Sequence, residues 1–568
     1  MVYFDFLVQV PDVPGKIVRK RLKDTVYIDF EYGRTYDPLR RFNIPKRTTI
    51  GKQCKENPSL MFPNQNFLRY FPDVEIPREK AGFERSSCLR IGAYLVIGKV
   101  VEDYGLQDML DGIFGGGGSF LLDLAAYSIV CESNAGQDYP DYAYNHPLFT
   151  DGMRIYSDSK VSSFLSSISD DHICTFLNEW NRKRNHRERI YISYDSTNKN
   201  CQAGDISIVE FGHPKEDRGL PVFNYAVAYD KTNREPLFYE EYPGSIVDVS
   251  QLQFMLEKAR GYGYRNVGFI LDRGYFSKGN IAYMDECGYD FVIMIKGMAG
   301  LVSGLITEHK GTFESNRACS IRSHKVYGKT VRTRLYASDA KERYFHLYYS
   351  SAKDSAEKEE VETKIDRMAK IISSYEMKYA SFPHTFSEYF DLVYDEKQDL
   401  FLFGNERSDV IERELGLCGY FVIVTSANMD AKEALDLYKS RDQQEKLFRG
   451  DKSYLGNRSA RVHSDESISG KIFVEFVALI IRNRMYCQLR DEMEAYVGKP
   501  NYMTVPAAIK ELEKIEMIKQ MDGIYRLDHA VTARQKNPLK AFGLDAAHVH
   551  KCAVELGKLL MKTKAQEA

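Results

Sequence analysis

The spacing of hydrophobic residues first predicts a helical region between about residues 83 and 187. There the segments LRIGAYLVIGKVVEDYGLQDMLDGI and FLLDLAAYSIVCES carry apolar residues at helical spacing. The glycine run from Gly115 to Gly118 separates them, and no Lys-Ser/Thr follows it as in a phosphate-binding loop, so we expect a flexible link. The basic run NEWNRKRNHRER near the end of this region is expected to be a solvated helix face.

From residue 188 the hydrophobic period changes to two, which indicates strands. We predict them at RIYISYD, around ISIVEFG, at VFNYAVAYD and at EPLFYEEY, with the turn KTNRE between the last two. A helix capped by Ser250, a buried strand NVGFILD, a helix after Ser277 and a buried strand YDFVIMIKG follow. This order predicts an α/β fold, a mixed sheet with helices on its faces as in ribonuclease-H-like folds.

Residues from about 300 to 428 interrupt this order and predict a β-rich (α+β) insertion. YGKTVRTRLYA and RYFHLYYSS indicate a hairpin, SAEKEEVETKIDRMAKIISSYE a charged helix, and FDLVYDEKQDLFLFG and GYFVIVTSA further strands. Beyond the insertion, Asp430 with Glu433 resembles a capping box that opens a helix through about Arg449. GKIFVEFVALIIRNRMYCQL predicts a second long helix, and a smaller mixed tail follows.

Composition narrows the class of protein without identifying it. The 568 residues are 43% hydrophobic and 28% charged, which is typical of a globular chain of about three to five domains. The net charge of -2 produces no global positive field, although local basic patches remain compatible with it. The ten cysteines are scattered without a C-x-x-C pair, so we expect a reducing cytosol, and neither a secretory signal nor a membrane span is recognisable.

The first sixty residues depart from this balance. They hold twelve Lys/Arg against seven Asp/Glu, a local net charge of +5, and aromatic residues alternate with basic ones in TVYIDFEYGRTYDPLRRFNIPKRTTIGK. We expect short strands around an RTYD turn, which form a basic hairpin. Such a hairpin is either a solvated surface element or an arm that contacts nucleic acid.

Two aspartates stand where predicted strands end. Asp195 closes RIYISYD, and Asp272 closes NVGFILD. A carboxylate at a strand end is often only a turn or cap residue, but ligands of open α/β sheets bind at this rim. Two fixed carboxylates with a third could hold two divalent metal ions about 3.5–4 Å apart, as phosphoryl-transfer sites do.

A third candidate element is the segment YKSRDQQEKLFRGDK. At helical spacing, Tyr438, Arg441, Glu445 and Lys452 fall within one narrow stripe. The stripe is either a solvated face with an Arg441–Glu445 pair or a carboxylate flanked by cations that hold DNA phosphates. Gly450 can end the helix before Lys452 and so weakens the second interpretation.

With these residues the chain resembles the DDE transposases of bacterial insertion sequences in the IS-four group, whose signature is Y-(2)-R-(3)-E-(6)-K. Tyr438, Arg441, Glu445 and Lys452 match every step of that spacing. YDSTN resembles the strand of the family's first Asp, and FILDRGYFSKGNIAYMDECGYDFVIMIKG resembles its second-Asp region. The likeness extends over roughly residues 85–545, and the N-terminal hairpin and long insertion resemble the IS1634-type branch.

The resemblance implies a ribonuclease-H-like catalytic domain in which Asp195, Asp272 and Glu445 bind two Mg²⁺ (or Mn²⁺) ions per active site. It also implies that Tyr438, Arg441 and Lys452 position DNA phosphates near the cleaved end. The partners would be double-stranded DNA, as terminal inverted repeats and as target, and a second copy of the chain in a homodimeric DNA complex. The protein would be cytoplasmic in a bacterium and nucleoid-associated when bound to DNA.

With the resemblance, the patterns divide the chain into six expected regions. They are an N-terminal basic hairpin region (1–82), a helical DNA-binding region (83–187), the first part of the catalytic core (188–299), the β-rich insertion (300–428), the second part of the core (429–492) and a C-terminal region (493–568). A cut-and-paste transposase is the expected function. A transposase-derived DNA-binding protein and a metal-dependent nuclease without integration are the alternatives, and the intact acidic triad argues against the former.

Some relatives in this group close the element end into a hairpin and stack a flipped base on a tryptophan beside the signature Arg. Here Asp442 follows Arg441, and the only tryptophan is Trp180. Either a nearby aromatic side chain replaces the missing ring, or a hairpin is not made this way. The nearby candidates are Tyr438, Phe448 and Tyr454.

Overall fold

The computed structural model describes residues 7–567 apart from 23–24, 38–40, 56, 73, 75–84, 185–187, 204–205, 213–218, 296–297, 396–399 and 497–502. The chain divides into two compact units. The first comprises Met1–His172, Glu466–Ile481 and Gln488–Ala568, and the second comprises Ile173–Asp465 and Arg482–Cys487. None of the helices in the described ranges combines the length and the apolar run that a membrane span requires.

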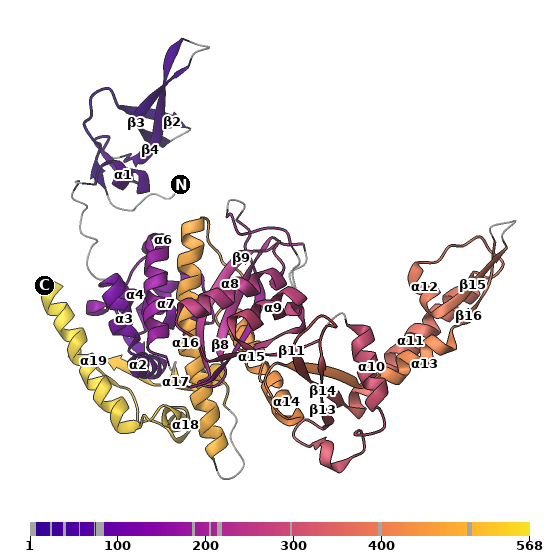
Figure 1. Ribbon diagram of the computed structural model, residues 1–568. Coiled ribbons are helices and arrows are strands. Elements are labelled where there is room, and N and C mark those ends of the chain that lie inside the picture. Colours follow the sequence, from indigo (N-terminus) through magenta and orange to yellow (C-terminus); the bar gives the residue numbers. More distant parts are fainter. Residues whose placement is uncertain are drawn as a thin grey trace. The chain divides into compact units, whose positions relative to one another are not determined.

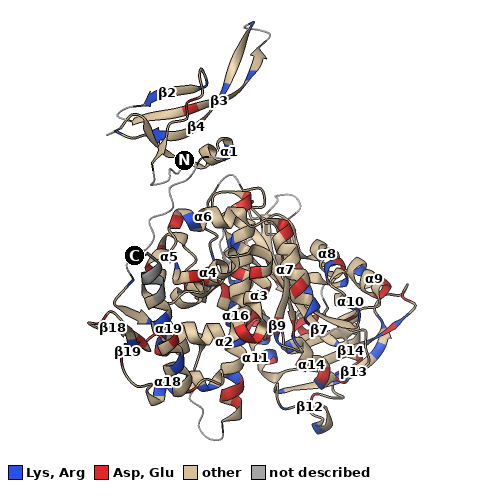
Figure 2. Cartoon of the chain, turned by 90° about the vertical axis from the view of Figure 1, so that its left-hand side faces the viewer, with Lys and Arg blue, Asp and Glu red and all other residues tan. Residues whose placement is uncertain are grey.

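An antiparallel sheet of five strands opens the first unit, in the order β1-β5-β4-β3-β2 (Figure 1). Its elements are β1 (Val8–Gln9), β2 (Ile17–Leu22), β3 (Thr25–Asp37), β4 (Phe42–Gln53), β5 (Leu60–Pro63) and the following α1 (Gln65–Tyr70). Ile28, Ile50, Met61 and Phe67 belong to one buried cluster, so α1 packs on the sheet through Phe67. In Figure 2, blue Lys and Arg positions recur along these strands, and red acidic positions are fewer.

The basic hairpin therefore forms part of a larger sheet, and its turn differs from the prediction. Arg34 to Asp37, the predicted RTYD turn, lie inside β3 and pair with β4. The chain reverses direction only after Asp37, because the cross-strand ladder continues through Asp37 and Phe42. Most of the connection, residues 38–40, lies outside the described residues.

The predicted helical region is helical. Its helices are α2 (Gly92–Tyr104), α3 (Leu106–Phe114), α4 (Gly117–Cys131), α5 (Tyr139–Asn145), α6 (Asp158–Ser167) and α7 (Asp170–Arg182). The expected glycine link is shorter than predicted, because Gly117 and Gly118 begin α4. A Cβ on Gly118 would lie 2.5 Å from the backbone nitrogen of Asp111, so this glycine lets α4 pack closely against α3.

The end of the chain completes the first unit. A three-stranded sheet has the order β19-β18-β6, with β6 (Cys88–Arg90), β18 (Glu516–Lys519) and β19 (Tyr525–Leu527). The C-terminal helices are α17 (Val505–Leu512), α18 (Ala533–Ala541) and α19 (Ala546–Glu567). Strand pairing thus joins residues near 90 to residues near 516.

The second unit is built on a mixed sheet of nine strands, in the order β12-β13-β14-β17-β11-β10-β7-β8-β9 (Figure 1). The strands are β7 (Ile190–Asn200), β8 (Val222–Asp230), β9 (Glu235–Pro243), β10 (Val267–Leu271), β11 (Asp290–Met294), β12 (Ser320–Ile321), β13 (Val326–Arg334), β14 (Glu342–Tyr349) and β17 (Tyr420–Thr425). β10 runs parallel to β7 and β11, whereas the other pairs are antiparallel. The helices α8 (Asp248–Gly261), α9 (Lys278–Cys287) and α10 (Ala299–His309) connect these strands.

Three local predictions in this region are wrong. β7 continues through Asn200 because β8 pairs with it along the whole of that length, so Asp195 lies inside a strand and does not end it. The segment around ISIVEFG forms no strand, and Glu210 makes only an isolated bridge to Val222. Helix α8 begins at Asp248, ahead of the predicted cap Ser250, whose hydroxyl donates to the carbonyl of Val247 at 2.8 Å. Ser277, by contrast, caps α9 as predicted.

The region predicted as an insertion contributes to two structures. Its hairpin β13–β14 and the strand β17 extend the nine-stranded sheet. Between them, α11 (Ser351–Ser374), α12 (His384–Tyr389), β15 (Phe390–Asp395), β16 (Leu400–Glu406) and α13 (Ser408–Leu417) share a hydrophobic cluster of their own. The predicted hairpin, charged helix and strands are all confirmed as elements.

The two predicted helices after the insertion become three. α14 (Ala431–Lys439) begins at the predicted cap Asp430, whose carboxylate accepts from the backbone N–H of Glu433 at 2.8 Å. α15 (Asp442–Tyr454) follows after a short break, and α16 (Asp465–Ala495) is the predicted long apolar helix. α16 contributes residues to both units.

Candidate active site

Parallel strand pairing brings the two predicted aspartates to neighbouring positions. In the ladder between β7 and β10, Tyr194 pairs with Leu271. Asp195 is the next residue of β7, and Asp272 directly follows the end of β10. Neighbouring strands lie about 4.8 Å apart, so this register sets the two carboxylates side by side. Asp195 therefore lies where the parallel pairing with β10 stops, although β7 itself continues along β8.

The guanidinium group of Arg441 contacts both carboxylates. Its Nη1 donates to Asp272 Oδ1 at 2.8 Å, and its Nη2 lies 3.7 Å from Asp195 Oδ2. The side chain of Arg441 is 11% exposed, that of Asp195 17% and that of Asp272 37%, so the group opens toward solvent on the Asp272 side. Burial alone would lower the pKa of Arg441, but the two carboxylates outweigh it and raise that pKa above its ordinary value.

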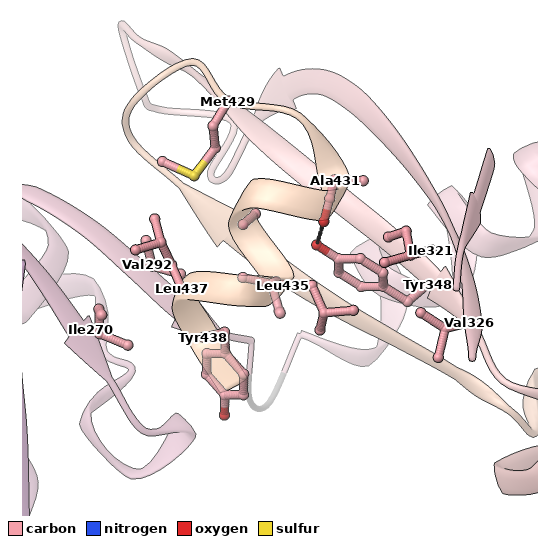
Figure 3. Close-up of a cluster of buried hydrophobic side chains, with 12 residues drawn as sticks. Ile270, Val292, Ile321, Val326, Tyr348, Met429, Ala431, Leu435, Leu437 and Tyr438 are labelled. Atoms are coloured by element: carbon pink, nitrogen blue, oxygen red, sulfur yellow. Dashed lines mark hydrogen bonds between the residues drawn. The ribbon is translucent and has the colours of Figure 1, made fainter. Parts of the chain in front are cut away.

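Helix α14 holds Arg441 in this position. Its apolar residues Leu435 and Leu437 pack into the buried cluster of the nine-stranded sheet, where Tyr348 donates its hydroxyl to the carbonyl of Ala431 at 2.7 Å (Figure 3). Tyr438 lies in the same cluster, and its hydroxyl oxygen accepts from Arg441 Nη1 at 3.0 Å. Burial raises the pKa of Tyr438, so the phenol stays protonated and neutral beside Arg441.

The four residues of the predicted stripe do not lie on one uninterrupted helix. Tyr438 belongs to α14, Arg441 precedes α15 as its N-cap residue, and Glu445 and Lys452 belong to α15. Within the described part of the chain, Arg441 pairs with the aspartates and does not form the alternative i,i+4 pair with Glu445. Tertiary contacts with β7 and β10 therefore override the local helical pairing.

Glu445 remains apart from the two aspartates. It is exposed in the first turn of α15, and its backbone N–H donates to the carbonyl of Arg441 at 3.1 Å. Across the described ranges, no three His, Cys, Asp or Glu side chains are grouped closely enough to hold a metal ion. The structure thus brings Asp195, Asp272, Arg441 and Tyr438 together, whereas Glu445 and the half-buried Lys452 lie further along α15.

The donor atoms suit a hard divalent cation, but the structure assembles only part of the set. Carboxylate oxygens are the ligands that Mg²⁺ and Mn²⁺ prefer, and Asp195 and Asp272 already converge on one positive charge. A divalent ion at that place would require Arg441 to withdraw. Glu445 is one helical turn from Arg441 and would supply the third carboxylate.

The sequence did not indicate what fastens α15 to the sheet. Lys199 Nζ, from β7, lies 2.8 Å from Asp451 Oδ2, from α15, and both side chains are fully buried.

A Cβ on Gly450 would lie 2.3 Å from Arg482 Nη1, so this glycine admits a guanidinium group and does not end the helix. The helix continues to Tyr454 and keeps Lys452 within it, contrary to the doubt raised by Gly450. The only signal in the sequence was the glycine at position 450 within a helical pattern.

Comparison with known proteins identifies the family of this region. The model of the transposase DDE domain family matches residues 193–481, which include all six predicted site residues. Among solved structures, the chain is similar to a piggyBac transposase synaptic complex with hairpin DNA, at 7% identity and a TM-score of 0.35 over 84% of this chain and 82% of that chain. It is also similar to a Mos1 transposase paired-end complex with the left transposon end, at 14% identity and a TM-score of 0.14 over 40% of this chain and 64% of that one. No curated protein matches the sequence, so the family assignment rests on the domain match.

Proposed function

This chain belongs to the transposase DDE domain family, and we propose that it is an active cut-and-paste transposase. It would cleave DNA at the terminal inverted repeats of its own element and join the freed ends to target DNA. One observation carries the proposal: Asp195 and Asp272, from adjacent parallel strands, converge on the guanidinium group of Arg441. A protein that only binds DNA has no need of paired carboxylates at such a rim.

The order of strands supports a ribonuclease-H-like core. Three consecutive antiparallel strands, β7, β8 and β9, are followed by β10 and β11, and the spatial order β9-β8-β7-β10-β11 is the one typical of that fold. A long segment then separates β11 from the helices that carry Arg441 and Glu445. Together with the Y-(2)-R-(3)-E-(6)-K spacing, this supports a place in the IS-four group and its IS1634-type branch.

Asp195, Asp272 and Glu445 are the residues that would hold the two Mg²⁺ (or Mn²⁺) ions. When bound, such ions would activate the attacking hydroxyl and stabilise the leaving oxygen. For the three carboxylates to meet, Arg441 must leave the aspartates and the first turn of α15 must approach them. A DNA phosphate offers Arg441 a replacement partner of the same charge, so end binding and assembly of the acidic triad would be linked.

The other signature residues would position DNA. Arg441 and Lys452 would contact phosphates near the cleaved end, and Tyr438 would hold the guanidinium of Arg441 through its hydroxyl, as it does here. The basic residues 1–60 and the helical region to about 187 would supply much of the affinity for terminal repeats. A homodimer on paired ends would let each subunit bind one end while it cuts the other.

A strand-transfer assay tests the proposal. The full chain is incubated with Mg²⁺, a supercoiled target plasmid and duplexes that carry the inverted repeats flanking the gene. We expect nicked ends and their joining to the plasmid. Cleavage without joining would identify a nuclease, and specific binding without cleavage would identify a DNA-binding protein derived from a transposase.

A further inference from the structure

The hairpin β3–β4 continues past the rest of its sheet as a two-stranded ribbon. β2 pairs with β3 only as far as Phe30, and β5 pairs with β4 only from Gly51 onward. β3 and β4 go on pairing with each other to Asp37 and Phe42. Residues 32–37 and 42–47, here called the ribbon, therefore pair only with one another among the described strands, and they extend away from the sheet (Figure 1).

A buried carboxylate at the base of the ribbon holds one arginine from each strand. Glu31 Oε1 accepts from Arg34 Nε at 2.7 Å, and Glu31 Oε2 accepts from Arg47 Nε at 3.2 Å. Glu31 is only 5% exposed, whereas the side chains of Arg34 and Arg47 are 64% and 41% exposed. The glutamate thus restrains two guanidinium groups that remain accessible, which lowers the entropy lost when they bind a ligand.

Strand register places further polar side chains on the same face as these arginines. Arg34 pairs with Pro45, and Tyr36 pairs with Asn43, so alternation puts Arg34, Tyr36, Asn43 and Arg47 on one face. All four are exposed, and Tyr36 is 58% exposed. We call this set the polar face of the ribbon.

We propose that the polar face of the ribbon enters the major groove of duplex DNA and reads base edges in the terminal repeats. This inference rests on the proposed function and deepens it. A two-stranded ribbon fits the major groove, arginine pairs with guanine through two hydrogen bonds, and asparagine pairs with adenine in the same way. The net charge of +5 over the first sixty residues complements DNA, in a chain that is otherwise acidic.

The test separates base reading from phosphate binding. Binding of the full chain to a duplex of the element end and to a scrambled duplex of equal composition is measured by fluorescence anisotropy at several salt concentrations. The variant with both Arg34→Lys and Arg47→Lys keeps the charge but loses the two-pronged geometry. We expect its preference for the end duplex to fall by about tenfold or more, with the scrambled affinity and the salt dependence unchanged.

Arg332→Lys is the matched control. Arg332 is an exposed arginine on β13, outside the ribbon, whose Nε lies 2.9 Å from a carboxylate oxygen of Glu342 on β14. The same substitution there should leave both affinities unchanged. Circular dichroism and thermal unfolding of each variant check that the fold is retained.

Methylation of guanine N7 in the end duplex provides an independent readout of the major groove. Some guanines, when methylated at N7, should weaken binding of the unaltered chain. We expect methylation of the same guanines to have no effect on binding of the double variant. Equal losses on both duplexes would overturn base reading and leave only phosphate contact. Unchanged affinity for both duplexes would likewise overturn base reading by these two arginines. If the unaltered chain selects end DNA but never nicks it, the proposed function fails and the ribbon's role stands. If the double variant keeps its selectivity for end DNA and still nicks it, the ribbon's role fails and the proposed function stands.

Discussion

Lys199 and Asp451 form an ion pair in which Nζ and Oδ2 lie 2.8 Å apart and neither side chain is exposed. Lys199 Nζ also lies 4.1 Å from the centre of the Tyr225 ring, and Asn457 donates to Asp451 Oδ1 at 2.7 Å. Lys199 follows Asp195 on β7, and Asp451 follows Glu445 on α15. The pair therefore joins the strand of one predicted catalytic carboxylate to the helix of another.

Removal of one member of this pair should destabilise the second unit strongly. Lys199→Met leaves a buried carboxylate without its cation, which costs about 3–5 kcal/mol, whereas Lys199→Met combined with Asp451→Leu should cost much less. Thermal unfolding by calorimetry measures both. The exposed pair of Lys370 and Asp366 is the control, since Lys370→Met there should change stability by less than about 1 kcal/mol. Equal losses in the two Lys variants would refute a role for burial.

Catalysis should require all three acidic residues while DNA binding does not. We expect Asp195→Asn, Asp272→Asn or Glu445→Gln to abolish metal-dependent nicking of end DNA and to leave its affinity within about threefold, because the charge of the phosphate-binding residues is unchanged. Nicking on a denaturing gel and anisotropy measure the two properties. An Asp272→Asn protein that cleaves at the unaltered rate would remove that residue from the site.

Arg441 should affect the rate of nicking more than the exposed Arg449 of α15 does. Arg441→Ala removes the guanidinium group that would hold a DNA phosphate at the cleaved end and is expected to lower the rate by about 10²-fold or more. Arg441→Lys should recover only part of this, since an ammonium group cannot make the two-pronged contact of a guanidinium group with a phosphate. Arg449→Ala, an exposed position on α15, is the control and should nick normally. Similar rates for Arg441→Ala and Arg449→Ala would contradict the assignment.

His346 should make the nine-stranded sheet sensitive to acid. Its buried ring lies between the hydroxyls of Thr330 and Thr425, each at 3.0 Å, and burial lowers its pKa to about 4 from 6.5. The unfolded chain therefore takes up this proton at higher pH than the folded chain. The contribution to stability is complete above pH 6.5 and is lost as the pH falls toward 4, a change on the order of 3 kcal/mol.

The His346→Gln variant should unfold with a smaller dependence on pH between 6.5 and 4. Urea titrations at several pH values measure this slope. His384→Gln is the control, because the His384 side chain is 90% exposed, and its slope should equal that of the unaltered protein. A slope for His346→Gln as steep as in the unaltered protein would show that other groups dominate acid unfolding.

Trp180 should play no part in stacking a flipped base. It is fully buried, its Nε1 donates to the carbonyl of Pro236 at 2.9 Å, and the guanidinium of Arg184 lies 3.8 Å from the ring centre. Trp180→Phe should therefore leave the products of end cleavage unchanged on a denaturing gel. A covalently closed product that disappears in Trp180→Phe would contradict this expectation.

The exposed fractions of the aromatic side chains near Glu445 indicate which of them is accessible to a flipped base. Tyr438 and Phe448 are 8% and 7% exposed, whereas Tyr454 is 36% exposed. A base can stack only on an accessible ring, so Tyr454→Ala should lower the yield of closed ends and Phe448→Leu should not. The same gel measures both variants.

Much of the second unit was predictable because the signals are local. Alternation in VFNYAVAYD predicted β8, and the caps Ser277 and Asp430 predicted where α9 and α14 begin. These features depend on residues within a few positions of one another. The prediction of a strand around ISIVEFG was wrong because alternation alone cannot supply a partner strand.

By itself, the sequence determined the candidate chemistry: two aspartates that follow apolar strand segments, and a signature of Tyr438, Arg441, Glu445 and Lys452. Only the tertiary structure decided which of them meet. Arg441 reaches Asp272 across 169 positions of sequence, and Lys199 is buried against Asp451, because strand register and helix packing bring these groups together. No local pattern encodes such a meeting, since both the cost of desolvating the charges and the charge pairing that offsets it arise only once the chain has folded.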